Sequence, residues 1–487
     1  MGPDHGGMIG PLLALTLVGV PPDYSKSYFT GLSRPSVTRV KVSSEDGPVV
    51  LIVVDAMRPD HLSPYGYSRD TTPQLTKLAN EGVLLTNYFV NGNWTRPSTA
   101  SMLTGLLPAT HAVERDQDRL AEQYVTLAEI LERSGVVTGA VVGNGNAGSA
   151  FGLSRGFSFY ADTAKHWRGL PSADQVVELA VPFLRKHAKE RFFLMLFFVD
   201  PHDPYHAPGA YENMFVTDPT VRLIRTPHWE LGTYSDAEIE RMRATYDGAL
   251  RYTDAAIGRF VDELKALGLY DKATLMVTSD HGEAFGEHGV FMHAHHLFEE
   301  IVRAPLIIKA PLMSERGGYN HFLFQTVDLM PTIVRAFGAP VPENLPGVDI
   351  FRHLSQPDKV DVDHRFVTCE FYNFGISRRM LRTYKSKVIY SDPANEEQFM
   401  ATVGKHKLLP SVSFTEETVQ MYDISTDPLE RHNLFDKSTG APGTRWWNLL
   451  QIVKRHRQVE SAGANAHVVE NIDPETRQDL KALGYIQ

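Results

Sequence analysis

Cysteine is nearly absent from this chain, since Cys369 is the single cysteine among 487 residues. No intramolecular disulfide can form, so the chain is not a disulfide-stapled scaffold, although the cellular compartment stays open. Dense runs of lysine and arginine are also missing, and a formal net charge of −10 gives no reason to expect nucleic acid as a partner. What remains is an ordinary globular composition, 43% hydrophobic and 22% charged, in a chain long enough for two domains.

The sequence contains no apolar run of the length that spans a membrane, so no integral membrane span is expected. Met8–Val20 is the one apolar segment near the start, and its 13 residues match a signal-peptide core in length. However, no Lys or Arg precedes it, and no clear small-residue cleavage site follows it. Two interpretations of this segment remain open. An export signal predicts a periplasmic or extracellular protein, and a plain apolar N-terminus predicts a cytoplasmic one.

Continuous β-branched and apolar runs recur along the chain with amphipathic stretches between them. Val49–Val54 reads VVLIVV, as expected for a strand buried on both faces of a parallel sheet. Alternation of such strands with helices predicts an α/β fold, a large, mixed, mostly parallel sheet sandwiched by helices. Further strands are expected at Val136–Val142, Phe192–Val199, Thr274–Thr278 and Leu306–Lys309, and helices at Thr72–Glu81, Val125–Arg133 and Ala255–Leu267.

Composition also divides the chain. A Pro-rich stretch around Pro340–Pro346 predicts a boundary between a catalytic domain, 48–340, and a smaller C-terminal α+β domain, 341–487. The C-terminal part is expected to contain a short strand at Lys387–Tyr390 and a final helix at Glu475–Ala482. Residues 1–47 form the apolar segment and a linker.

Residues that follow buried strands carry the expected chemistry, because ligands bind at the carboxyl ends of the strands in open α/β sheets. Asp55 comes directly after the first strand, and the pair Asp280-His281 follows Thr274–Thr278. A carboxylate beside an imidazole offers two kinds of metal ligand from one rigid platform. From these residues alone, two structural roles are the alternatives to metal binding: Asp55 could cap a loop, and Asp280-His281 could be a structural pair.

Thr95 lies just ahead of Pro97 and a run compatible with a helix. Proline is favoured in the first helical turn, so the positive end of that helix is expected to point at Thr95 and to favour an anion there. A simple N-cap is the competing interpretation. Further along, His202 follows another buried strand, and His293 and His295 belong to a His-rich segment after Asp280. So many imidazoles near strand ends indicate a polar cleft that needs proton donors, or else a solvated loop.

From about Pro48 onward the chain resembles the sulfatase family of the alkaline-phosphatase superfamily. The resemblance rests on seven segments in order. They are LIVVDAMRPDHLSPYGYSRDTTPQLTKLANEGV (51–83), NWTRPSTASMLTGLLPATH (93–111), PHDPY (201–205), TSDHGEAFGEHG (278–289), FEEIVRAPLII (298–308), VDLMPTIVRAFG (327–338) and MYDISTDPLERHNL (421–434).

The resemblance implies a divalent metal bound by Asp55, Asp280 and His281. Thr95 falls at the position of the family's nucleophile, which also touches the metal. His202 matches the family's histidine at the substrate or leaving group, and His293 or His295 lies where a further substrate-contacting basic residue is expected. A carboxylate-rich set with one His fits Mn, Ca or Zn.

The sequence departs from the sulfatase pattern at the nucleophile. Sulfatases convert a Cys or Ser in a Cys/Ser-x-Pro-x-Arg motif to formylglycine, whereas this chain has Thr95, and Thr99 in place of the Arg. Threonine cannot yield that aldehyde. Ala56 replaces a second Asp often found after the first strand, and Asn144 and Asn146 stand where the family has Lys and His.

These differences favour phosphoryl transfer over sulfate hydrolysis. The expected enzyme is a metal-dependent hydrolase of phosphoric mono- or diesters that works through a phosphothreonine, with a small anionic ester as substrate. In this hypothesis Arg96 and Asn144 stabilise the substrate oxygens, and His202 protonates the leaving oxygen. A sulfuric ester hydrolase, a phosphoglycerol- or phosphoethanolamine-type transferase and an inactive sulfatase-like binding protein are the alternatives. The oligomeric state is not indicated.

Overall fold

The computed structural model describes residues 47–464, except 164–172, 228–233, 312, 314–315, 357–364, 404–411 and 437. The segment Met8–Val20 and the helix expected at Glu475–Ala482 lie outside these ranges. Among the described helices, none combines the length and the hydropathy needed to cross a bilayer.

An eight-stranded sheet forms the centre of the molecule, in the order β10-β2-β9-β6-β1-β5-β3-β4. Only β9 runs antiparallel to its neighbours in this sheet, so the predicted mixed, mostly parallel sheet is confirmed. The strands are β1 Val49–Val54, β2 Val83–Phe89, β3 Val137–Val142, β4 Phe159–Asp162, β5 Phe192–Phe198, β6 Thr274–Thr278, β9 Arg303–Lys309 and β10 Gly318–Gln325. All five strands expected in this part of the sequence are present.

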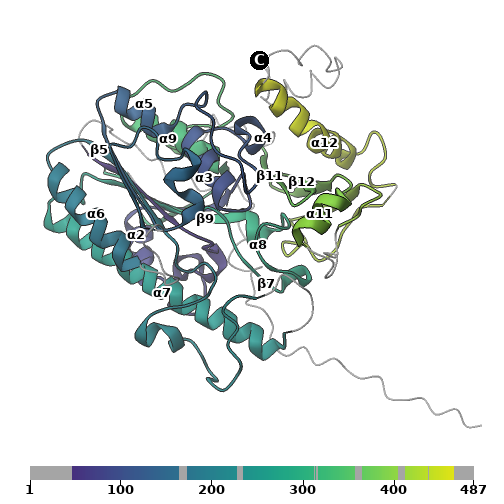
Figure 1. Cartoon of the computed structure of the whole chain (residues 1–487), viewed down its shortest axis with the longest axis horizontal. Coiled ribbons are helices and arrows are strands. Elements are labelled where there is room, and N and C mark those ends of the chain that lie inside the picture. The colour runs from purple at the N-terminus through teal and green to yellow at the C-terminus, as the bar shows by residue number, and fades with distance from the viewer. Residues whose placement is uncertain are drawn as a thin grey trace, which may run out of the picture.

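Helices cover both faces of this sheet, as Figure 1 shows for α2, α6 and α7 on one side and α3, α5 and α9 on the other. The helices are α2 Pro73–Glu81, α3 Thr95–Thr104, α4 Pro108–His111, α5 Leu127–Arg133, α6 Ala173–His187, α7 Asp236–Ala266, α8 Glu299–Val302, α9 Leu329–Ala336, α10 Ile350–Ser355, α11 Glu396–Val403 and α12 Arg445–Ala464. The expected helix at Ala255–Leu267 is the second half of α7, which begins much earlier because Ser235 and Glu238 form a capping box there.

The core is divided by the sheet, and β1 shows how. Successive side chains on a strand point to opposite faces. Val50, Ile52 and Val54 therefore pack with α2, α6 and α7, while Val49, Leu51 and Val53 pack with the helices of the other face. All six are buried, which accounts for the unbroken apolar run in the sequence.

A second, antiparallel sheet of four strands lies beside the first, at the right of Figure 1. Its strands are β11 Val367–Asn373, β12 Ile376–Arg382, β13 Ser386–Ser391 and β14 Thr418–Asp423, and α12 packs on it. The small C-terminal α+β unit is thereby confirmed as a fold class, and β13 includes the strand expected at Lys387–Tyr390. The division of the chain at residue 340 stays a prediction.

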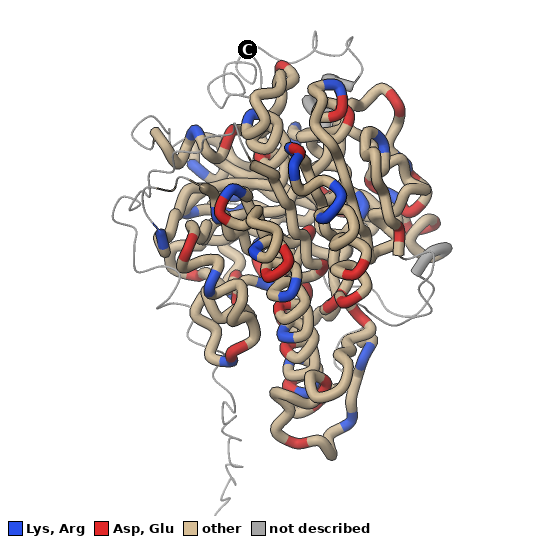
Figure 2. Tube along the Cα trace, turned by 90° about the vertical axis from the view of Figure 1, so that its left-hand side faces the viewer, with Lys and Arg blue, Asp and Glu red and all other residues tan. Residues whose placement is uncertain are grey.

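The second sheet joins the first next to the segment that precedes α3. The backbone N–H of Glu370 donates to the carbonyl of Asn91 at 2.9 Å, and the Asn91 side chain donates to the carbonyl of Thr368 at 2.8 Å. Gly92 forms a parallel bridge with Glu370. The residues just before Thr95 are therefore fixed by β11. Acidic and basic residues are interspersed along the side of the molecule seen in Figure 2.

Candidate metal centre and active site

Four neighbouring strands, β6, β1, β5 and β3, end at the same edge of the sheet. Asp55 follows β1, Asp280 and His281 follow β6, Asn144 follows β3 and His202 follows β5. The structure brings the metal ligands expected from the sequence together, because donor atoms of Asp55, Asp280 and His281 lie within 4.8 Å of one another. All three side chains are fully buried.

The contacts of His281 show that this group fits a cation. Its Nδ1 lies 2.8 Å from the carbonyl of Gly282, which can only accept, so Nδ1 carries the proton. The lone pair of Nε2 then faces Asp55 Oδ1 at 3.3 Å and Asp280 Oδ2 at 3.4 Å. Neither carboxylate oxygen has a hydrogen-bond donor. A neutral imidazole and two carboxylates whose acceptor atoms converge fit a divalent cation.

The pKa values of the group agree with this assignment. Burial raises the pKa of Asp55 to about 6 and that of Asp280 to about 7, and the proximity of the two carboxylates adds to the second shift. Burial lowers the pKa of His281 to about 3, so this imidazole is neutral. The negative charge of the group is costly without a cation between the carboxylates.

Thr95 is the first residue of α3, as the sequence predicted, and its side chain lies at the same group. Its Oγ1 is 3.4 Å from His281 Nε2 and 3.3 Å from the side-chain nitrogen of Asn144. The N-terminus of a helix carries a partial positive charge, which favours a negatively charged oxygen at this position. The hydroxyl is thus placed beside the metal ligands, in a setting that stabilises an alkoxide.

Asn144, expected to contact the substrate, also contacts the metal-ligand group. Its side-chain nitrogen donates to Asp55 Oδ2, while its Oδ1 accepts from the backbone N–H of Asn146 at 2.8 Å. The amide therefore has a fixed orientation, with its N–H groups turned toward Asp55 and Thr95.

His202 and His293 line the other side of the group. The ring of His293 is 4.2 Å from that of His281 and 4.9 Å from that of His202, measured between centroids. Burial alone would lower the pKa of His202, but the charges of Asp55, Asp203 and Glu283 outweigh it and raise this pKa to about 9. The His202 imidazole is therefore protonated and cationic at neutral pH.

Two acidic residues of the site, Asp203 and Glu283, were missed in the sequence. Glu283 is fully buried, its pKa is raised to about 7 by burial, and it faces His293 Nδ1 at 3.2 Å. Asp203 Oδ1 lies 3.3 Å from His202 Nδ1. A signal was present for both, because each lies within three residues of a predicted site residue and follows the same strand.

Arg96 is not brought to the group. Its guanidinium donates to the carbonyls of Arg115, Asp116 and Asp118 and to Asn146 Oδ1, and it lies 3.5 Å over the ring of Phe151. These contacts hold the loop at 115–118 and the segment of Asn146 together. Arg96 thus supports the site through Asn146 and Asn144.

His295 is also separate from the group, although it lies only two residues from His293. It lines a cavity of about 270 Å³ together with Arg378 and Tyr422 of the second sheet. Of the two histidines between which the sequence could not choose, His293 is the one at the metal ligands.

Comparisons with known proteins agree with this fold. The family model described as "Sulfatase" matches residues 48–339, and the model for the C-terminal part of N-sulphoglucosamine sulphohydrolase matches 286–445. An ulvan-active sulfatase of Formosa agariphila is 27% identical over 350 residues, which cover 65% of this chain and 67% of that protein. The multifunctional alkaline phosphatase superfamily protein PehA of Trinickia caryophylli is 23% identical, with 79% and 90% covered.

Solved structures share the whole architecture. BT4656, solved with its substrate D-glucosamine-2-N,6-O-disulfate, has a TM-score of 0.67 at 20% identity and covers 88% of this chain and 100% of its own. The phosphonate monoester hydrolase of Agrobacterium radiobacter has a TM-score of 0.65 at 20% identity, with 86% and 96% covered. The fold is therefore that of the alkaline-phosphatase-like sulfatases, and with well over half of its length matched by the family model, this ester hydrolase belongs to the sulfatase family.

Proposed function

We propose that this protein hydrolyses phosphoric mono- or diesters and that Thr95 is its nucleophile. The observation that carries the proposal is the position of Thr95 Oγ1, 3.4 Å from His281 Nε2 at the positive end of α3. A hydroxyl in that place attacks an anionic ester held by the same cation and helix end.

A threonine excludes the aldehyde chemistry of formylglycine sulfatases. The aldehyde is made from Cys or Ser, and an aldehyde hydrate releases sulfate by elimination. Cys369, the one cysteine, is buried in β11 of the second sheet and cannot replace Thr95. A Thr ester must instead be cleaved by water, which is the course of phosphoester hydrolases with a covalent intermediate.

The reaction proceeds in two displacements. The Thr95 hydroxyl releases its proton to solvent, Oγ1 forms a bond to phosphorus while the bond to the leaving oxygen breaks, and His202 supplies the proton that the leaving oxygen takes up. Water then attacks the phosphothreonine, the Thr95 Oγ1–P bond breaks, and Thr95 Oγ1 takes up a proton from solvent. His202, left neutral by the first step, accepts the proton of that water.

Asp55, Asp280, His281 and Thr95 would hold a divalent cation, which would lower the pKa of the Thr95 hydroxyl and neutralise charge on the substrate oxygens. Asn144 orients Asp55 and donates toward the attacking oxygen. Mn, Ca and Zn all suit a set of two carboxylates, one hydroxyl and one imidazole.

A sulfuric ester hydrolase is the second candidate, and the names of the relatives favour it. The Formosa protein is an ulvan-active sulfatase, and several other relatives are arylsulfatases. In this alternative Thr95 attacks sulfur directly, with the same cation and the same proton donor.

The two candidates are separated by nitrophenyl substrates. Hydrolysis of a phosphate monoester, a phosphodiester, a phosphonate ester and a sulfate is compared for the wild type and Thr95→Ala, with Mn²⁺, Ca²⁺ or Zn²⁺ added back. We expect phosphoester turnover that falls on the order of 10³-fold or more in Thr95→Ala. Sulfate turnover alone would overturn the proposal.

The matched control is Thr104→Ala, at the far end of the same helix, where the hydroxyl donates to the carbonyl of Ala100 and accepts from the backbone N–H of Leu106. This variant should keep its activity. Mass spectrometry of acid-quenched reactions should find phosphate on the peptide containing Thr95 and not in Thr95→Ala. An alcohol acceptor in the assay distinguishes a transferase, which would form the new ester in preference to free phosphate.

A further inference from the structure

A cavity of about 270 Å³ lies between the His-rich segment after β6 and the second sheet. The segment contributes His288, His295 and His296 to its lining, and the sheet contributes Arg378 of β12 and Tyr422 of β14. Sites that enclose a whole small molecule usually measure about 300–1,000 Å³. The size of this cavity therefore suits one substituent of a larger ligand.

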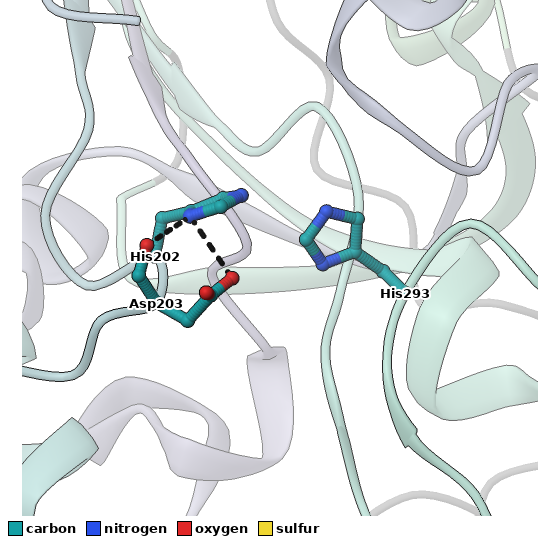
Figure 3. Close-up of side chains that lie close together, drawn as sticks. All are labelled: His202, Asp203 and His293. Carbon is teal, nitrogen blue, oxygen red and sulfur yellow. Dashed lines mark hydrogen bonds and ion pairs between the residues drawn. The ribbon is translucent and has the colours of Figure 1, made fainter. Parts of the chain in front are cut away.

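The cavity adjoins the candidate active site. Figure 3 shows His293, which lies at the metal ligands, and His295 follows it two residues later. Two residues of extended chain span at most about 7 Å. The same segment is tied to the start of α3, because the Asn93 side chain donates to the carbonyl of His296 at 3.1 Å and Asn93 lies two residues before Thr95. A substrate whose ester bond lies at Thr95 is thus within reach of the cavity.

His296 brings a buried hydrogen-bond donor to the cavity. Its Nδ1 accepts from the backbone N–H of Phe298 at 3.4 Å, so Nε2 carries the proton. Burial, together with the charges of His288 and Arg378, lowers the pKa of His296 well below 6.5 and keeps the ring neutral. The side chain is 2% exposed, and Nε2 has no acceptor among the described residues. A buried donor without an acceptor is costly, so an acceptor group placed in the cavity is favoured.

Arg378 gives the cavity a positive charge. The side chain is buried, and burial lowers its pKa to about 10, so the guanidinium is still charged at neutral pH. A guanidinium donates two parallel hydrogen bonds to a carboxylate or a phosphate, and a sulfate offers oxygens in the same arrangement as a phosphate. Arg431 adds a second cation to the lining, at an exposed position. The donors and the charge together fit an anionic group.

Two carboxylates lie at the cavity, and each has a cationic partner. Glu430 Oε1 is 2.7 Å from Lys387 Nζ, and its Oε2 accepts from the backbone N–H of Glu299 at 2.7 Å. His288 Nδ1 is 3.0 Å from Glu300 Oε1, and its Nε2 is 3.1 Å from a backbone carbonyl. Burial alone would lower the pKa of His288, but Glu300 outweighs it and raises this pKa to about 9. Neither carboxylate therefore opposes an anion with its full charge.

We propose that this cavity is a subsite for a second acidic group of the substrate, so that the enzyme prefers esters whose alcohol half carries a carboxylate, a sulfate or a phosphate. Arg378 and His296 donate to that group, and Arg431 attracts it from the exposed side. The inference rests on the proposed function only in placing the ester bond at Thr95. It holds for a phosphoric and for a sulfuric ester.

Matched aryl esters test the subsite. The probes are the 4-(carboxymethyl), 4-(sulfomethyl) and 4-(phosphonomethyl) derivatives of phenyl phosphate, and the methyl ester of the first is the neutral reference. Phosphate release is measured with Mn²⁺, Ca²⁺ or Zn²⁺ added back. We expect the wild type to cleave at least one acidic probe with a kcat/KM about 10- to 100-fold above that of the reference. The three probes show which acid the subsite prefers.

The preference should disappear in Arg378→Gln and weaken in Arg431→Gln, while kcat/KM for the neutral reference stays within about threefold of the wild-type value. The ratio of two kcat/KM values does not depend on the folded fraction of a variant. Arg379→Gln is the matched control and should keep the preference. Arg379 is the next residue of β12, so its side chain points to the opposite face, where it donates to the carbonyl of Lys454.

Binding gives a readout that needs no turnover. Isothermal titration calorimetry with Thr95→Ala should show tighter binding of the preferred acidic probe than of the reference, and addition of Arg378→Gln should abolish the difference. Equal values for acidic and neutral probes in the wild type, or a preference that survives both Arg378→Gln and Arg431→Gln, would overturn the inference. If only sulfates are cleaved, the matching aryl sulfates are compared. A preference lost on substitution would then support the subsite while rejecting the proposed function.

Discussion

Asn144 joins Asp55 to Thr95 through one amide nitrogen, which donates to Asp55 Oδ2 and lies 3.3 Å from Thr95 Oγ1. The amide thus links a metal ligand to the proposed nucleophile across two strands and a helix. Its orientation is fixed by the backbone N–H of Asn146.

Replacement of Asn144 by Ala should lower kcat by about 10- to 100-fold on the preferred ester, because a buried donor to the reacting group is lost. The thermal midpoint should change little. Steady-state kinetics test this, with Asn80→Ala as the control, since Asn80 is an exposed residue of α2. An unchanged kcat would show that the Asn144 amide does not contribute to the reaction at Thr95.

Arg96 should prove to be a supporting residue. Arg96→Gln is expected to lower the free energy of unfolding by about 1–3 kcal/mol, since its hydrogen bonds to loop carbonyls and its contact with Phe151 are lost. Its KM for a phosphodiester should stay near the wild-type value, whereas kcat falls modestly through displacement of Asn146. A large rise in KM at unchanged stability would instead place the guanidinium on the substrate.

His111, which is not among the candidate metal ligands, makes the protein sensitive to acid. Its Nδ1 accepts from the backbone N–H of Val113 at 3.1 Å and its Nε2 lies 3.0 Å from Ser101 Oγ, so the buried ring is neutral. Burial lowers its pKa from 6.5 to about 3. The unfolded chain therefore binds the proton first, and the stabilisation present above pH 6.5 is lost as the pH falls toward 3.

Between pH 6.5 and pH 3, protonation of this one histidine should lower the free energy of unfolding by about 1.4 kcal/mol for each unit by which the pH falls. Urea unfolding of the wild type and His111→Gln at several values between pH 7 and pH 4.5 measures it. The variant should be less stable at pH 7 but should lose stability less steeply. Parallel curves for the two proteins would contradict the prediction.

Lys387 of β13 connects the second sheet to α8 through buried charges. Its Nζ lies 2.7 Å from Glu430 and 3.3 Å from Glu299 at the start of α8, and Lys387 is fully buried. Lys387→Met should lower the free energy of unfolding by about 3–5 kcal/mol, because it leaves a buried carboxylate without its partner. Adding Glu430→Gln should restore part of the loss, while Lys385→Met, at an exposed position, should have little effect. Chemical denaturation of the three variants gives the comparison.

Much of the fold and the proximity of Asp55, Asp280 and His281 could be predicted because they depend on strand ends. The apolar run of β1 indicates a strand buried on both faces, and the carboxyl ends of parallel strands meet at one edge. The positions of Asp55, Asp280 and His281 directly after such runs are therefore enough to predict that they lie together. Thr95 could be placed at a helix start from Pro97 alone.

The side-chain positions of the histidine segment at 293–295 and of Arg96 could not be predicted from the sequence. Met292 and Ala294, on either side of His293, have positive φ values of 64° and 65°, so the segment follows no regular period that would tell His293 from His295. Arg96 is next to Thr95 in the sequence, but successive side chains on a helix are about 100° apart, so it points to another neighbour. The residue types alone therefore do not show which way the side chains of His293, His295 and Arg96 point.

The bridge between Gly92 and Glu370 gives the second sheet a share in positioning Thr95. Thr95 lies three residues from a backbone pairing whose other half is supplied by a strand more than 270 positions later in the chain. A ribosome must therefore complete β11 before the turn that presents the hydroxyl can reach its final shape. The native contacts of the turn before Thr95 are consequently complete only after β11 has been synthesised.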